Sequence, residues 1–215
     1  MNLQQPISIG DYPIKGVDFS HHTGTPVNFE TIKNEDGFQF VSLKASSVRG
    51  RIDPNFKQYW GDAKAAGITR GAYHYMYHDH TAEYDANLFL EAIGEKLEEG
   101  DLPPVLDMEI QNPPFEKMHK WLSIVEKALG VKPMLYTGMR YYNDNNFAEH
   151  FPDYTLWIAR YNRHNHPPTQ DWTFWQWQQN VNIKGVPGLP NKGVDLNVFR
   201  GTKEEFNQLL YKKTN

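Results

Sequence analysis

Apolar and polar residues follow two alternating rhythms along this chain. Short runs in which apolar residues alternate with polar ones, or follow one another directly, predict strands, whereas longer stretches with apolar residues three and four positions apart predict amphipathic helices. The predicted strands are Lys15–Ser20, Phe38–Ala45, Ile68–Tyr77, Pro104–Ile110, Lys132–Thr137, Thr155–Tyr161, Thr173–Gln178 and Gly193–Phe199. Strands that alternate with helices favour a parallel sheet, and eight strands suggest that the sheet closes on itself.

The clearest helices are predicted between the early strands, over Pro54–Ala66, Thr81–Glu98 and Pro114–Leu129. Each is followed at or near its end by a glycine that can take the left-handed conformation of a helix stop, namely Gly67, Gly100 and Gly130. After the fifth strand the spacings shorten and leave only a weak helical stretch around Met139–His150. We therefore expect an α/β fold, a single TIM-like barrel with fewer helices than strands.

Length and composition point to one domain. The chain of 215 residues fits a single core and contains no linker or repeat, so we assign residues 14–215 to the barrel and residues 1–13 to an N-terminal extension. With 22 basic and 26 acidic residues the net charge is -4, which argues against nucleic acid as a partner. The first residues lack the apolar core of a secretion signal, and no apolar run reaches the ~20 residues of a membrane span. We expect a monomer that does not insert into membranes.

Two carboxylates stand two residues apart in the predicted strand Pro104–Ile110. Alternate side chains of a strand share a face, so Asp107 and Glu109 point one way and the apolar residues that alternate with them point the other. Like charges this close raise the proton affinity of at least one member, so one carboxyl can stay protonated while its neighbour is ionised. Cleavage of a glycosidic bond needs such a proton donor beside a negative charge. Two merely solvated acids at a strand end are the alternative.

Acids recur in the first and last predicted strands. Asp18 shares its predicted face with Gly16 and Ser20, and Asp195 shares its face with Asn197. Because the first and last strands adjoin in a closed barrel, we expect Asp18 and Asp195 to lie near each other, at the strand ends where catalytic groups of such barrels sit. Four acids would then surround one cleft. Alternatively, Asp18 caps the turn that follows it and Asp195 bonds a neighbouring strand.

Further motifs follow one another in a fixed order: Gly16-Val17-Asp18-Phe19-Ser20-His21-His22, Lys44-Ala45-Ser46, Asp53-Pro54-Asn55-Phe56, Gly71-Ala72-Tyr73-His74-Tyr75, Leu106-Asp107-Met108-Glu109 and Gly193-Val194-Asp195-Leu196-Asn197. Their content and order resemble glycoside hydrolase family 25 over roughly residues 14–210. The resemblance implies a flattened barrel of about eight strands and five helices, without a cofactor. It also implies an endolysin-like lysozyme of the Chalaropsis type. Such muramidases act at the bacterial cell wall, outside the cytoplasm, and cleave the β-1,4 bond between N-acetylmuramic acid and N-acetylglucosamine in peptidoglycan.

By that resemblance, Glu109 is expected to be the general acid. Asp107 is expected to orient or stabilise the 2-acetamido group of the substrate, although a nucleophilic role is also considered. Asp18 and Asp195 are expected to hold this pair and to support the cationic transition state through charge. Since Asp107 and Glu109 project from one strand, they lie on the same side of the sugar, which favours attack by the substrate's own acetamido oxygen and net retention.

Sugar contacts are expected among aromatic side chains near the strand ends. The candidates are Tyr73, Tyr75, Tyr136, Trp157, Tyr161, Trp175 and Trp177. Strand parity forbids all of them from facing the cleft at once, and it favours Tyr136 and Trp157, whose apolar neighbours can take the outward positions. Packing in the core is the alternative for each aromatic residue.

One element departs from the family pattern. Members commonly carry Glu-Gly after the Lys-Ala-Ser element, whereas this chain has Ser47, Val48 and Arg49 before Gly50. A cleft carboxylate is therefore expected to be missing, and Arg49 or Arg51 could reverse the local charge.

Three histidines, His74, His78 and His80, invite interpretation as a metal site. His80 falls near a turn, however, and no partner that would orient the ligands can be identified, so we expect hydrogen bonding at the cleft rim and no metal.

Two other functions stay open. A chitinase-like hydrolase also has an Asp-x-Glu motif, but it needs further acids upstream, where this chain has Leu102 and Val105. A catalytically silent glycan-binding barrel would lack the acid, whereas Glu109 is present.

Overall fold

The protein is an α/β barrel in the computed structural model, which describes residues 9–24, 26–47, 51–161, 166–168, 171–186 and 193–213. Its strands are β1 (Lys15–Phe19), β2 (Phe40–Ser47), β3 (Arg51–Ile52), β4 (Thr69–Tyr75), β5 (Val105–Asp107), β6 (Met134–Gly138), β7 (Leu156–Ala159), β8 (Phe174–Val181) and β9 (Val194–Phe199). Its α-helices are α1 (Phe29–Asn34), α2 (Phe56–Ala65), α3 (Ala82–Ile93), α4 (Phe115–Leu129), α5 (Met139–Asp144), α6 (Phe147–His150) and α7 (Lys203–Leu209).

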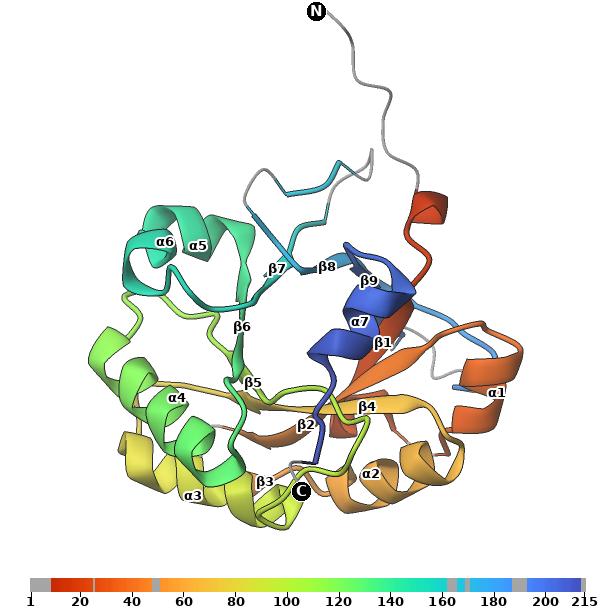
Figure 1. Ribbon diagram of the computed structural model, residues 1–215, viewed down its shortest axis with the longest axis horizontal. Helices are drawn as coiled ribbons and strands as arrows, with labels where there is room; N and C mark the ends of the chain where they lie inside the picture. Colours follow the sequence, from red (N-terminus) through yellow and green to blue (C-terminus); the bar gives the residue numbers. More distant parts are fainter. Residues whose placement is uncertain are drawn as a thin grey trace, which may run out of the picture.

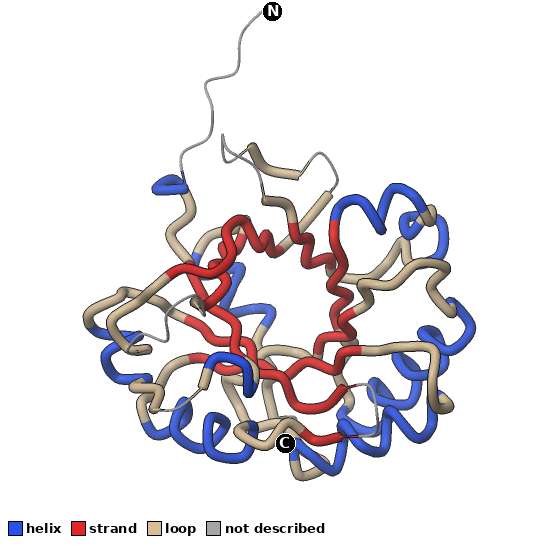
Figure 2. Tube along the Cα trace, turned by 180° about the vertical axis from the view of Figure 1, so that it is seen from behind, coloured by secondary structure: helices blue, strands red, loops and turns tan. Residues whose placement is uncertain are grey.

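Eight of the strands close into a barrel in the order β1-β2-β4-β5-β6-β7-β8-β9, with β9 returning to β1. The short β3 lies outside this ring as an antiparallel partner of the end of β2. The strands form a closed ring in Figure 2, with most of the helices around it. The predicted closed barrel of eight strands is therefore confirmed.

Three details of the sequence prediction are wrong. The sheet is not wholly parallel, because β9 runs antiparallel to both β1 and β8. Helix α3 ends at Ile93 rather than near Glu98, since Gly94 takes the left-handed conformation (φ 74°) that stops it. The described residues form seven α-helices rather than about five, because α1 and α7 are too short to show a clear helical period.

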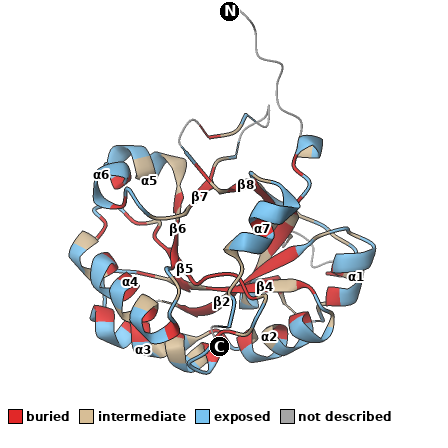
Figure 3. Ribbon diagram, viewed as in Figure 1, coloured by how far each residue is buried: buried red, intermediate tan, exposed pale blue. Residues whose placement is uncertain are grey.

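Apolar residues on the outer face of the sheet pack beneath the helices. Helix α4 illustrates the pattern, because its buried residues recur three and four positions apart and form one stripe: Met118, Trp121, Leu122, Val125 and Leu129. Figure 3 shows the helices buried towards the strands and exposed on their outer side. No helix in the described ranges is long and apolar enough to cross a membrane.

A second apolar cluster fills one end of the barrel interior. It combines inward-facing residues of several strands with Phe206 of α7, whose ring lies 5.7 Å from the ring of Phe40 on β2. In Figure 1, α7 lies over this end of the barrel. The polar inward-facing residues therefore lie towards the opposite end, where the parallel strands finish.

Candidate active site

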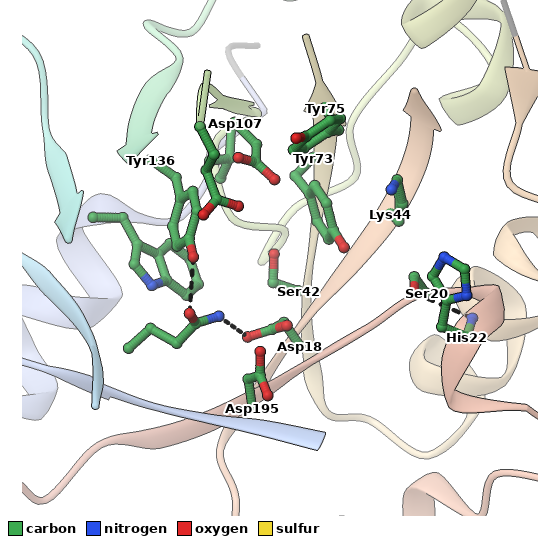
Figure 4. Close-up of a pocket in the computed structure, with 14 residues that line it drawn as sticks. Asp18, Ser20, His22, Ser42, Lys44, Tyr73, Tyr75, Asp107, Tyr136 and Asp195 are labelled. Atoms are coloured by element: carbon green, nitrogen blue, oxygen red, sulfur yellow. Dashed lines mark hydrogen bonds between the residues drawn. The ribbon is translucent and has the colours of Figure 1, made fainter. Parts of the chain in front are cut away.

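A pocket of about 250 Å³ opens at the carboxyl ends of the parallel strands. Four carboxylates line it, from β1, β5, the residues after β5, and β9: Asp18, Asp107, Glu109 and Asp195. A second hollow of about 350 Å³ shares Asp18, Tyr73 and Asp195 with it and so continues the cleft. The structure thus brings together all four acids that the sequence singled out. Figure 4 labels three of them, Asp18, Asp107 and Asp195.

The backbone around Met108 directs Asp107 and Glu109 to the same side. Strand β5 ends at Asp107, earlier than predicted, but extended pairing continues because Met108 N donates to Tyr136 O (3.0 Å). The Thr137 hydroxyl also donates to Met108 O (2.6 Å). Met108 is fully buried beneath the helices, so the residues on either side of it face the pocket. Asp107 is only 6% exposed, whereas Glu109 is partly exposed.

Asp18 and Asp195 lie directly opposite each other in the ladder between β1 and β9. Asp195 stands near the start of its strand, whereas the sequence reasoning placed the acids at carboxyl ends. Because β9 is antiparallel to its neighbours, its start meets their carboxyl ends at one edge of the barrel. The antiparallel direction of β9 is therefore what carries Asp195 into the cleft.

Two amides hold the Asp18 carboxylate in place. Gln176 Nε2 and Asn197 Nδ2 both donate to Asp18 Oδ2 at 2.7 Å. These amides are themselves fixed, because Tyr136 donates to Gln176 Oε1 (2.8 Å) and the Trp157 indole donates to Asn197 Oδ1 (2.9 Å). Tyr136 of β6 and Trp157 of β7 thus orient Asp18 of β1 indirectly, each through one amide side chain.

Burial raises the pKa of all four cleft acids, and repulsion from neighbouring carboxylates adds to this effect for Asp18, Asp107 and Glu109. Burial, assisted by the charge of Asp195, raises the pKa of Asp18 from 3.8 to about 8. Burial and then the charge of Glu109 raise the pKa of Asp107 well above its ordinary value. Burial also raises the pKa of Glu109, although a hydrogen bond with Asp107 lowers it. Asp107 and Glu109 therefore both bind a proton more readily than an ordinary carboxyl group, and the protonation of one affects the other.

Asp107 also presents an unused acceptor to the pocket. Its Oδ1 atom is buried and has no hydrogen-bond partner within the described part of the chain. A buried carboxylate oxygen without a donor is unfavourable, so a ligand that supplies an N–H or O–H group there would gain binding energy.

The predicted aromatic contacts separate into two groups. Tyr73, Tyr75, Tyr136 and Trp157 line the pocket, whereas Tyr161 does not, although its hydroxyl donates to the lining residue Gln176. The expectation for Trp175 needs correction, because its side chain is fully buried on the outer face of the sheet. There it packs against Tyr12 (6.3 Å between ring centroids). Its neighbour Gln176 takes the inward position, so strand parity turns Trp175 away.

Trp177 likewise does not line the pocket; it packs partly buried against the apolar clusters outside the barrel.

The three histidines considered for a metal point to different places. His74 is fully buried on the outer face of β4, where its Nδ1 lies 2.8 Å from Ser46 Oγ. His78 contacts Gln111 O at 3.3 Å, and the ring of His80 lies beside Tyr84. Among the described residues, no group of three histidine or acidic side chains could hold a metal ion.

Sequence reasoning missed Gln176 as a member of the site, and it named Asn197 and Lys44 without giving either a role. The alternation of large apolar residues with Gln176 in β8 was the signal available, because it turns the amide inward. Of the segment that departs from the family pattern, Val48, Arg49 and Gly50 lie outside the described residues.

Known proteins match this chain over most of its length. The sequence model described as Glycosyl hydrolases family 25 matches residues 17–186. YegX of Escherichia coli is 34% identical over 205 residues, which cover 90% of this chain and 72% of that protein. Lysozyme M1 of Streptomyces globisporus is 27% identical over 216 residues, which cover 88% of this chain and 68% of that protein.

A family 25 glycosyl hydrolase from Bacillus anthracis has a similar solved structure. It superposes with a TM-score of 0.79 at 27% sequence identity, and the match covers 97% of this chain and 98% of that one.

Proposed function

Because this chain belongs to glycosyl hydrolase family 25, it is a muramidase that cleaves peptidoglycan, and we propose that it does so with net retention, using Glu109 as the acid. The scissile bond is the β-1,4 bond between N-acetylmuramic acid and N-acetylglucosamine. The observation that carries the proposal is the pair formed by Asp107 and Glu109. Both carboxyl groups have a raised pKa, and Asp107 has a buried carboxylate oxygen without a donor among the described residues.

The unused Oδ1 atom of Asp107 suits the N–H group of the 2-acetamido substituent on the sugar. A donated hydrogen bond stabilises the ionised form of Asp107. Binding of the substrate therefore favours the state in which Asp107 is ionised and Glu109 carries the proton. Glu109 is the more exposed of the two and can deliver that proton to the leaving oxygen. Substrate binding thus prepares the acid.

The same contact prepares the nucleophile. Ionised Asp107 polarises the acetamido group and aligns its carbonyl oxygen, which attacks the anomeric carbon as the glycosidic bond breaks. Water then attacks the anomeric carbon and breaks its new bond to the acetamido oxygen, while Glu109 takes a proton from this water. The anomeric carbon has then been inverted twice, so the product keeps the β configuration. Asp18 and Asp195 face the same cleft and in their ionised forms stabilise the developing positive charge, with Gln176 and Asn197 holding Asp18 in position.

Fragments released from purified peptidoglycan test the bond assignment. After borohydride reduction, mass spectrometry should find muramitol at the new ends. Glucosaminitol ends would identify a glucosaminidase, and absence of digestion by folded protein would contradict the assignment as a hydrolase.

Proton NMR of the first-formed product tests the stereochemistry. A β-anomer that appears before mutarotation supports retention, whereas an initial α-anomer would show inversion through water activated by another acid such as Asp18. A covalent ester trapped on any carboxylate would keep retention but remove the acetamido oxygen as nucleophile.

The organisation around the site is also proposed. Residues 14–215 form the catalytic barrel, which acts as a monomer on the glycan strands, outside the cytoplasm and without membrane insertion. Tyr12 packs against Trp172 and Trp175, and Ile14 enters the inner apolar cluster, so the chain joins the barrel at this point. A sedimentation measurement of molecular mass in solution tests the monomer.

A further inference from the structure

One side of the pocket carries a different charge from the rest. Figure 4 shows Lys44, Ser20 and His22 along this side, away from Asp107 and Tyr136. Lys44 is the one lysine or arginine among the described lining residues, in a pocket that otherwise holds four carboxylates. No carboxylate of the described residues forms an ion pair with its ammonium group. Its charge lowers the pKa of Asp107 and Glu109 from a distance, while its N–H groups are left to a ligand.

Two kinds of contact fix the position of Lys44, one made by its side chain and one made by the end of its strand. Its Nζ lies 4.9 Å from the centroid of the Tyr75 ring, which attracts the cation while leaving its N–H groups able to donate. Beyond Lys44, the pairing of β2 with β4 shifts by one residue, so Ser46 turns outward. Ser46 then contacts buried His74, which stacks on Trp121 (5.6 Å). The end of β2 is anchored behind the pocket, and Lys44 projects into it.

A peptidoglycan strand brings negative charge into this acidic cleft. Each muramic acid carries a lactyl group on O3, which ends in a free carboxylate or in an amide to a peptide that has its own carboxylates. Near the ionised carboxylates of the cleft such a group would be repelled, whereas next to an ammonium group it would be attracted. The pocket therefore offers one favourable place for a substrate carboxylate.

We propose that Lys44 binds a carboxylate of the muramic acid residue and thereby makes the cleft select glycans that carry this group. The inference rests on the proposed function, because it takes peptidoglycan as the substrate. Both the lactyl carboxylate and the first carboxylate of the attached peptide supply the required chemistry, and the substrates of the test distinguish them.

The test compares Lys44→Gln with Lys44→Arg, which keeps the charge. Each is assayed on glycan strands stripped of peptides by an amidase, on strands with intact peptides, and on both after their carboxylates have been converted to neutral methylamides. For Lys44→Gln we expect about a 10-fold rise in KM on the charged strands with kcat largely kept, as for one partly exposed charge-assisted contact. Lys44→Arg should stay close to the parent protein. The neutralised strands should bind parent and variant alike.

Each outcome either identifies the carboxylate that Lys44 binds or overturns the proposal. A loss on stripped strands identifies the lactyl carboxylate, and a loss confined to peptide-bearing strands identifies the peptide carboxylate. An equal loss on charged and neutral strands would overturn the proposal, since Lys44 would then act through Asp107 and Glu109. An unchanged KM would overturn it as well.

A binding measurement separates this proposal from the proposed function. Equilibrium binding of the same strands to Glu109→Gln and to Glu109→Gln combined with Lys44→Gln needs no cleavage. A difference in affinity for charged strands alone supports the role of Lys44 even if the parent protein cuts no strand. If the two proteins bind alike, the proposal fails whatever the enzyme cleaves.

Discussion

Two carboxyl groups of nearly identical chemistry have different surroundings here, and the proposed mechanism gives them different roles for that reason. Asp107 is buried with an unused acceptor atom, whereas Glu109 is partly exposed and lines the pocket. Strand parity in the sequence was enough to place both on one face. It could not show which would be the deeper, because that depends on where β5 ends and on what covers it.

Replacing Glu109 by glutamine should lower kcat by about 10²–10⁴-fold, because the amide keeps the shape but cannot deliver a proton. Folding and glycan binding should be largely kept, as checked by circular dichroism and a binding assay. Near-normal turnover of this variant would show that another residue of the cleft, such as Asp18 or Asp195, is the general acid.

Replacing Asp107 by asparagine should impair turnover severely and also change its pH dependence. In the parent protein, loss of the last proton from the pair creates two adjacent negative charges, which raises the pH at which it leaves. Without Asp107 this repulsion is gone, so the alkaline limb of kcat/KM should move to lower pH. An alkaline limb that stays in place would show that the proton is held outside this pair.

At the scale of elements, the polar contacts beneath α3 and α4 connect the helices to the catalytic strands. Lys117 of α4 pairs with buried Asp85 of α3 (2.8 Å), and His74 of β4 lies 3.6 Å from the same carboxylate. Although burial alone raises the pKa of Asp85, its interactions with His74 and Lys117 bring the pKa below its ordinary value. The charge is therefore kept inside the protein because both partners are present.

Replacing Lys117 by methionine should destabilise the fold by about 3 kcal/mol or more, since it leaves the Asp85 charge buried with only His74. Lys120 of the same helix provides a matched control, because its pair with Glu83 is exposed on both sides (59% and 48%). Lys120→Met should change stability by about 1 kcal/mol at most. Urea unfolding at pH 7 measures both, and equal effects would contradict the structural role given to Asp85.

The hydrophobic pattern predicted the strands well because each one has a buried apolar face. The pattern could not predict the direction of a strand or the presence of a short helix. Nothing in the alternation within Gly193–Phe199 tells whether β9 runs parallel or antiparallel, since a strand shows the same period in either direction. The helix α7 is short and is stabilised by inserting Phe206 into the barrel, a tertiary contact that no local period reveals.

At the scale of the molecule, the cleft gathers carboxylates at the expense of stability. Asp18 has a pKa of about 8 in the folded protein against an ordinary 3.8, so the folded state holds its proton more tightly than the unfolded state. The stability that this proton contributes is full below about pH 4 and is lost as the pH rises through 8. The parent protein should therefore weaken across this range.

Replacing Asp18 by asparagine removes this dependence. Relative to the parent, the variant should gain stability between pH 5 and pH 8, by a few kcal/mol at the upper end, in denaturant titrations at both pH values. Glu91→Gln supplies the control, because it makes the matching change from carboxyl to amide at an exposed position of α3 outside the cleft. A constant difference between Asp18→Asn and the parent at both pH values would contradict the raised pKa.

The pairing of β9 with β1 also determines at which stage of folding the site can form. Asn197 donates to Asp18 across a sequence separation of 179 residues, and Gln176 does so across 158. Contacts of such high contact order must wait for most of the chain, because closing so long a loop before other structure has formed is entropically unfavourable. A chain without β9 cannot assemble all four acids, because Asp195 lies on that strand. The hydrolase therefore gains its complete cleft only when its last strand joins its first.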